Sequence, residues 1–145
     1  MKKHFTIAAI TLALLLVVGC QHNPGTTNPQ LKAAQNNDQV SIVLNLFCKQ
    51  EINFKNTIDA ATHKSVQQKC LQIAQYDEKV TSDIAANDLT TAQKDIGLAV
   101  SLAQSISADL LNIKDAGTKS TLQIAQESLV IGLTTWQTAL AQLGK

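Results

Sequence analysis

The sequence predicts an all-α fold, an up-and-down antiparallel bundle of four helices behind a flexible N-terminal tether. Apolar residues make up 45% of the 145 residues and aromatic residues only 3%. A composition so rich in Ala, Leu, Ile and Val suits helices that pack closely through small side chains. From residue 38 onward, apolar residues recur at spacings of three and four in four segments separated by short breaks. Consecutive helices joined by short breaks are antiparallel neighbours, so chain order predicts the topology.

The first two helices are expected over about 38–56 and 63–86. Asp38 can cap the first helix. Glu51 and Lys55 stand at i and i+4, in the order that favours a weak ion pair on an exposed face. The turn is placed at 57–62, although capping by Thr57 would allow the second helix to begin there. The two apolar stripes are Val40, Leu44, Phe47, Phe54 and Ile58, with Ile42, Val43 and Leu46 beside them, and Val66, Cys70, Ile73, Val80 and Ile84.

The last two helices have the most regular stripes and form a long hairpin. Breaks near 86–88 and 115–119 bound them, and Gly117 suits the left-handed position after a helix end. A capping box of Ser120 and Gln123 fits the start of the final helix. The stripes are Leu89, Ala92, Ile96, Ala99, Ala103, Ile106, Leu110 and Ile113, then Leu122, Ala125, Leu129, Leu133, Trp136, Leu140 and Leu143.

The N-terminus has the features of an export signal. Lys2 and Lys3 precede about fourteen mostly apolar residues, fewer than the roughly 18 needed to span a bilayer. The run ends in Val17-Val18-Gly19-Cys20, which resembles the lipobox of bacterial lipoproteins. The resemblance covers residues 1–20. It implies that 1–19 is a signal peptide, that Cys20 carries the lipid, and that this lipid is the membrane anchor.

Residues 20–37 are expected to be the lipidated cysteine and a flexible linker, and 38–145 the bundle domain. The linker holds both prolines, Pro24 and Pro29, among Thr, Asn and Gln residues without an apolar period. Leu31 and the alanines beside it could already belong to a helix, so the sequence does not fix the residue at which the linker ends. Gln21 at the position after the lipidated cysteine favours the outer membrane, with the domain facing the periplasm.

Two further cysteines, Cys48 and Cys70, form an even pair in a compartment that permits oxidation, which predicts a disulfide. Residue 59 lies midway between them, so a turn there puts the two sulfurs level in an antiparallel hairpin. Closing this loop of about 22 residues contributes roughly 3 kcal/mol in the chain-entropy model. A metal site from both cysteines and His63 is the rival interpretation, although the spacing matches no common metal motif.

Catalytic chemistry is not indicated anywhere in the sequence. No nucleophile with a base, carboxylate pair or phosphate loop assembles, so no catalytic residue, metal ligand or cofactor is assigned. His63 is interpreted as an exposed loop histidine, and Asp77, Glu78 and Asp83 as a solvated face. The twelve basic residues are all lysines and nearly balance eleven acidic ones. This balance argues against a nucleic-acid partner.

Small residues in the final hairpin are the one unusual surface feature. Glycine inside a helix costs about 1 kcal/mol relative to Ala, so such positions need a reason. Close helix contact is one explanation, and a groove for a lipid, apolar ligand or partner helix is the other. The small residues are Gly97, Ser101 and Ser105 in one helix and Ser128 and Gly132 in the next, where Trp136 takes the following position and would flank the groove.

Together these features predict a non-enzymatic, membrane-anchored periplasmic lipoprotein that binds or blocks another envelope component. The alternative is an envelope lipoprotein that holds a small apolar ligand or a metal in the bundle interior.

Overall fold

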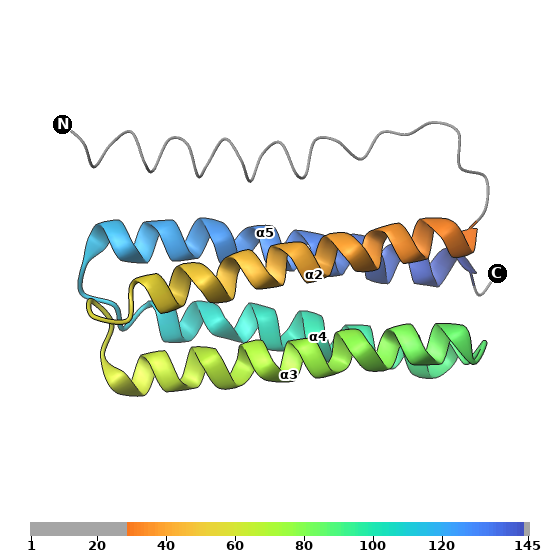
Figure 1. The fold of residues 1–145 in the computed structure, drawn as a ribbon, viewed down its shortest axis with the longest axis horizontal. Helices are drawn as coiled ribbons and strands as arrows, with labels where there is room; N and C mark the ends of the chain where they lie inside the picture. Colours follow the sequence, from red (N-terminus) through yellow and green to blue (C-terminus); the bar gives the residue numbers. More distant parts are fainter. Residues whose placement is uncertain (1–28, 144–145) are drawn as a thin grey trace.

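A computed structural model of the chain describes residues 29–143, with side chains from Asn36 onward. This part holds four helices and no strand: α2 (Pro29–Asn53), α3 (Ala60–Ala85), α4 (Leu89–Leu110) and α5 (Ala116–Leu143). The predicted all-α, up-and-down bundle is confirmed. Successive helices run antiparallel (Figure 1), and α2 packs against both α3 and α5, so that the four helices close into a ring. The predicted signal peptide, Cys20 and the first part of the linker lie outside the described residues.

The helix α2 begins nine residues earlier than the predicted start at Asp38. Residues 29–37, expected to belong to the linker, are its first turns. Proline is tolerated at the first helical position because its missing N–H would have no helical partner there. The alanines at 33 and 34 favour helix, and the helical domain therefore extends back to Pro29.

Aspartates fix the starts of α3 and α4. The Asp59 carboxylate accepts hydrogen bonds from the backbone N–H of Ala61 (3.1 Å) and Thr62 (2.9 Å), so α3 starts at Ala60 rather than at 63. Asp88 accepts from the Thr91 N–H at 3.1 Å and caps α4 in the same way. Between these helices Asn87 takes a left-handed φ of 59°, which asparagine tolerates.

Gly117 does not end α4, contrary to the expectation from the sequence. The helix α4 stops at Leu110, and Gly117 lies in the first turn of α5 without a positive φ. Asp115 accepts a 2.7 Å hydrogen bond from the Thr118 N–H, the geometry of an N-cap. The helix α5 therefore starts before the Ser120 and Gln123 pair that was expected to cap it.

The core consists of the apolar stripes that the sequence predicts. Among the members predicted for α4 and α5, only Leu89 and Leu143 at the helix ends are less than fully buried. In α2 the outer residues Ile42 and Leu46 remain exposed. None of the described helices is long and apolar enough to cross a membrane. The largest fully buried apolar side chains are Phe47, Ile73, Ile96, Ile106, Leu110, Ile113, Leu122, Leu129, Leu133, Trp136 and Leu140.

We expect Leu133→Ala to lower the free energy of unfolding by about 2 to 5 kcal/mol, because it removes buried apolar surface and leaves a cavity. Leu111, which is 65% exposed, provides the matched control. Leu111→Ala should change stability by no more than about 0.5 kcal/mol. Urea unfolding followed by circular dichroism measures both. Equal effects of the two changes would contradict this assignment of the core.

Candidate functional site

The two cysteines of the predicted disulfide meet between α2 and α3. Both are free thiols in this structure, Cys48 partly exposed and Cys70 buried. The two side chains lie close enough for each to shift the pKa of the other, and they share the register of the Ser41/Asp77 and Glu51/Gln67 contacts, as a bridge requires. The turn that allows it covers 54–59, three residues before the expected 57–62.

The contact makes the two sulfurs chemically unequal. The hydrogen bond from Cys70 lowers the pKa of the Cys48 thiol, although burial and the nearby charge of Glu51 oppose this. The same bond and burial raise the pKa of Cys70 far above its ordinary value, and negative charge at Cys48 and Glu51 adds to the effect. Of the pair, Cys48 therefore ionises first and Cys70 retains its proton.

A fully buried carboxylate lies one helical turn from Cys48. Glu51 is 0% exposed, and both of its oxygens are engaged by side chains of α3. The His63 Nδ1 lies 2.5 Å from Oε1, and the Gln67 amide donates to Oε2. An ionised carboxylate only accepts, so Nδ1 is the donor. His63 is 33% exposed and connects this group to solvent.

The predictions for Glu51 and His63 are wrong. Glu51 was expected on an exposed face beside Lys55, and His63 in a loop, whereas the two form a buried contact between α2 and α3. A signal for Glu51 was present, because the stripe Val40, Leu44 and Phe47 reaches position 51 at the next four-residue step. The same kind of signal was present for His63, which lies one three-residue step before Val66 in the stripe of the second helix.

The rival interpretation of Cys48, Cys70 and His63 as a metal site gains no support. In the described range, no group of three or more His, Cys, Asp or Glu side chains is arranged to hold a metal ion.

A third polar contact joins α2 to α3 farther along the pair. Ser41 Oγ donates to Asp77 Oδ2 at 2.6 Å. Burial raises the pKa of Asp77, the Ser41 bond opposes the rise, and the charges of Glu78 and Asp38 add to it. The expected solvated face thus holds for the exposed Glu78, but Asp77 and Asp83 are partly buried, each with one carboxylate oxygen lacking a hydrogen bond.

These contacts share one register, and we call them the polar seam: Ser41/Asp77, Cys48/Cys70 and Glu51/Gln67, with His63 beside the last pair. The members of each pair lie at equal distances along the chain on either side of Asp59. The α3/α4 interface has polar links of its own, since Lys69 pairs with Asp109 at 2.7 Å. These lie at its margin, whereas the seam includes the fully buried Glu51.

The five small residues and Trp136, predicted to form a groove in the last hairpin, do not line a common one. A Cβ on Gly97 would meet Gln137 of α5, whereas one on Gly132 would meet Val40 of α2. Ser101 and Ser105 line a hollow beside α3 instead. Residues four apart advance about 40° beyond a full turn, so each row of three drifts around its helix.

The remaining two members, Ser128 and Trp136, complete this picture. Ser128 bonds the Ile124 carbonyl of its own helix. Trp136 is 0% exposed and belongs to the core, where its indole N–H has no partner. A Cβ at Gly97 or Gly132 would meet its neighbour at 3.4 or 3.9 Å, an ordinary van der Waals distance, so close helix contact does not require glycine at either position.

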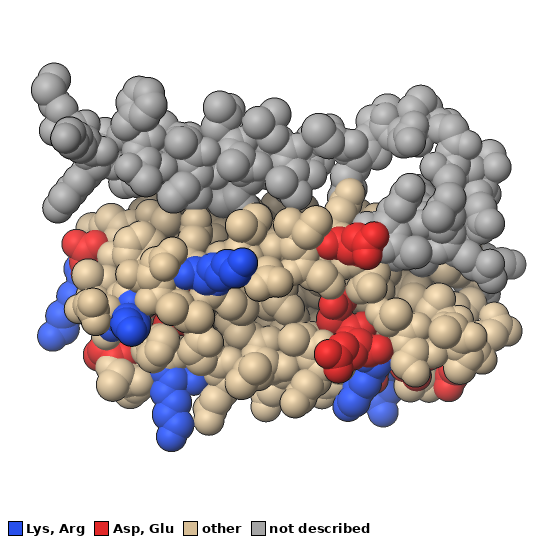
Figure 2. Space-filling model, in the orientation of Figure 1, with Lys and Arg blue, Asp and Glu red and all other residues tan. Residues whose placement is uncertain are grey.

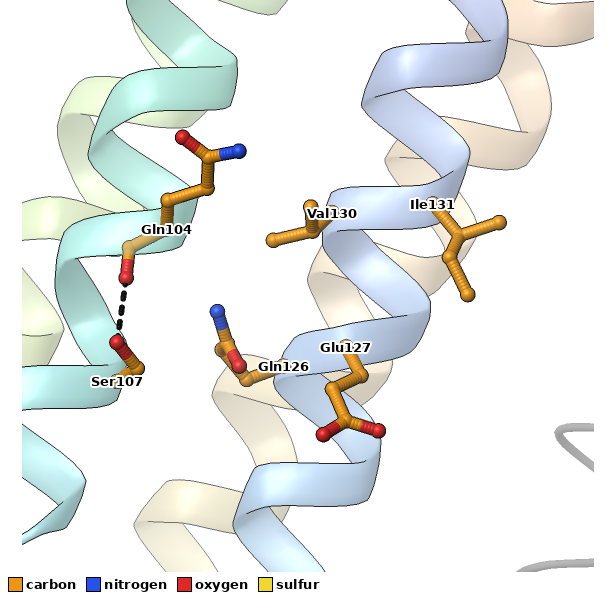
Figure 3. A pocket seen from close by; sticks show the side chains of 6 residues that line it. All are labelled: Gln104, Ser107, Gln126, Glu127, Val130 and Ile131. Carbon is orange, nitrogen blue, oxygen red and sulfur yellow. Dashed lines mark hydrogen bonds between the residues drawn. The ribbon is translucent and has the colours of Figure 1, made fainter.

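A shallow groove of about 380 Å³ does run between α4 and α5, and none of the six predicted residues lines it. Gln126 and Val130 point toward α4, whereas Ile131, 55% exposed, projects from the side of α5 that faces away from α4 (Figure 3). The Gln126 amide donates to the Ala103 carbonyl at 2.8 Å, which fixes the floor of the groove.

Charge is spread thinly over the molecular surface. On the face shown in Figure 2, acidic and basic side chains stand in small mixed groups, with wide areas carrying neither. Such a surface fits the near-neutral composition and offers no extended basic patch on this face.

No family model matches this chain, and no curated protein or solved structure matches it significantly.

We expect His63→Ala to lower the free energy of unfolding by about 1 to 3 kcal/mol, because it leaves a buried Glu51 oxygen without its donor. Adding Glu51→Gln should recover part of the loss, so that the double variant is more stable than the sum of the single effects. Lys55→Ala, at an exposed position, is the control. Chemical denaturation measures the parent protein, the two single variants, the double variant and the control, and a neutral His63→Ala would contradict the contact with buried Glu51.

Asp77→Asn should stabilise the fold at neutral pH. A raised pKa means that folded Asp77 binds its proton more tightly than unfolded Asp77, so its ionisation opposes folding above the folded pKa. The advantage of the variant should shrink as pH falls through the raised pKa of folded Asp77, and it should disappear only below the ordinary carboxyl pKa of about 4, where the unfolded chain is also protonated. Melting temperatures across this range test the sign. The exposed Glu127→Gln should show no such trend.

Proposed function

We propose that the protein is a non-enzymatic lipoprotein of the bacterial envelope, a helical bundle held at the outer membrane that binds or blocks another envelope component in the periplasm. The proposed location in the envelope rests on the order of three features: Lys2 and Lys3, the apolar run, and Val17-Val18-Gly19-Cys20.

The geometry of the bundle supports a defined orientation on such an anchor. Between Cys20 and Pro29 lie eight residues, which span at most about 28 Å when extended. The start of α2, the α3/α4 turn and the end of α5 lie at one end of the bundle (Figure 1). This end stays near the membrane, and the turns at 54–59 and 111–115 lie about 40 Å farther out.

The contact surface that we propose is the groove between α4 and α5. No charged residue occurs in 96–108 or in 128–144. Exposed Ile131, two glutamine amides and the Ser107 hydroxyl suit a largely uncharged segment of an envelope protein, with the isoleucine as the apolar anchor. Glu127 is the one charged residue that lines the groove. These stretches contain no basic side chain that could neutralise the phosphates of a nucleic acid.

The Cys48/Cys70 contact supports a disulfide in this compartment. Two thiols already in contact across an antiparallel pair need little movement to be bridged. The bridge would staple α2 to α3 and leave the groove on the α4/α5 side unchanged.

An interior site for an apolar ligand is the less favoured function. Side chains from all four helices fill the core, with Trp136 fully enclosed among them. The hollows at α4/α5 and α3/α4 open at the surface.

Lipid labelling tests the anchor. Cells given labelled fatty acid should incorporate it into the protein, and Cys20→Ala should abolish the label and release the domain from the membrane fraction. Labelling that persists in Cys20→Ala would remove the basis for this address.

Site-specific crosslinking in living cells tests the binding role. A photoreactive residue at Ile131 should capture one envelope protein, whereas the same residue at Leu71, 64% exposed on α3, should not. Ile131→Glu should abolish this capture, which is then followed with the photoreactive residue at position 104 instead. The same change should abolish the protein's effect in cells without changing the melting temperature. Equal capture from Ile131 and Leu71 would refute the proposed surface.

A further inference from the structure

The polar seam contains reactive groups that a purely structural staple does not require. Cys48 and Cys70 differ in access as well as in chemistry: Cys70 is 3% exposed and Cys48 is partly open to solvent. A disulfide donor therefore reaches the Cys48 sulfur first. A thiolate, not a thiol, attacks a disulfide, and the hydrogen bond from Cys70 favours the thiolate at Cys48.

We propose that the pair is a directional thiol–disulfide exchange site, in which Cys48 is the attacking sulfur and Cys70 the resolving sulfur. The co-reactant is a disulfide, carried by an oxidoreductase or by a small molecule. The inference goes beyond the proposed binding function and does not depend on the lipid anchor.

The reaction has two balanced steps. The Cys48 thiolate attacks one sulfur of the donor disulfide, forming a mixed disulfide and releasing the other donor sulfur as a thiolate. Cys70 then loses its proton to water, and its thiolate attacks the Cys48 sulfur and expels the second donor thiolate. The protein loses two electrons and the donor gains them, so a Cys48–Cys70 bridge and a donor dithiol, or two free thiols, result.

Glu51 sets the rate of the first step without touching the reacting atoms. Its negative charge raises the pKa of both thiols, while contact with His63 Nδ1 and the Gln67 amide holds it in place. Glu51 is therefore a positioning residue: its charge disfavours the Cys48 thiolate and so slows the attack of Cys48 on the donor. The titratable groups that face Cys48 are Glu51 on its own helix and Cys70 on α3.

The test uses the full chain with Cys20→Ser, which leaves only the two thiols of the seam. Dithiobis(nitrobenzoate), a symmetrical aromatic disulfide, is added to Cys70→Ser and to Cys48→Ser, and the coloured thiolate is followed in time. At neutral pH, Cys48 should react at least about tenfold faster than Cys70. In urea the two rates should converge. A Cys70 that reacts as fast as Cys48 in the folded protein would overturn the proposal.

Two comparisons separate the chemistry from simple exposure. In Cys70→Ser a hydroxyl can still donate a hydrogen bond to Cys48, whereas Cys70→Ala has no donor at this position. The midpoint of the pH–rate profile should therefore be higher in the alanine variant. Glu51→Gln should shift the midpoint for Cys48 downward and speed the reaction at neutral pH. Unchanged midpoints in both comparisons would contradict the assigned roles.

Mass spectrometry tests the second step. With both thiols present, the reaction should release two aromatic thiolates per chain and leave no adduct, because Cys70 resolves the mixed disulfide. Cys70→Ser should retain one adduct on Cys48. A two-thiol protein that retains an adduct on each sulfur would show that Cys70 does not resolve the mixed disulfide.

Discussion

The burial of the Glu51 carboxylate is the constraint on which the relation of α2 to α3 depends. A charge removed from water is tolerated only when partners replace the lost hydration. His63 and Gln67 supply these partners from one face of α3, one helical turn apart. A shift of either helix by one turn would separate the carboxylate from both donors. The requirement therefore fixes the register of the pair far more sharply than apolar contacts do, because those tolerate sliding.

The remaining polar contacts of the seam follow from this register. Ser41 meets Asp77 and Cys48 meets Cys70 because both pairs lie at the same offset as Glu51 and Gln67. Apolar and polar contacts therefore have different roles in the bundle. Apolar stripes on all four helices supply the burial, and α2/α3 adds the polar groups that select one arrangement. Selecting one arrangement of packed helices is one use of buried polar groups. In this bundle the same row of polar contacts also holds the only two thiols among the described residues.

Much of the fold can be predicted from the sequence, because the stripes of α4 and α5 repeat at three and four residues almost without interruption. Helix ends are harder to predict, since a single Asp side chain at 59 or 115 decides them. The seam could be found only in part. The midpoint argument places Cys48 beside Cys70, but a Glu in an apolar stripe gives no sign of whether it is buried until the facing residue is known. The row of Gly97, Ser101 and Ser105 misled because repeated steps of four, with no step of three between them, drift around the helix.

The closed ring of helices determines how the domain responds to force. A pull applied at the start of α2 acts along the helix axis, while α3 and α5 hold α2 on either side. All lateral contacts of α2 are then loaded together in shear, instead of opening one after another as in a zipper. The last polar contacts of α2 before the turn at 54–59 are those of Glu51 and Cys48. The thiol pair thus lies at the far end of the loaded helix, and its oxidation would decide whether a strained α2 slides out or remains attached.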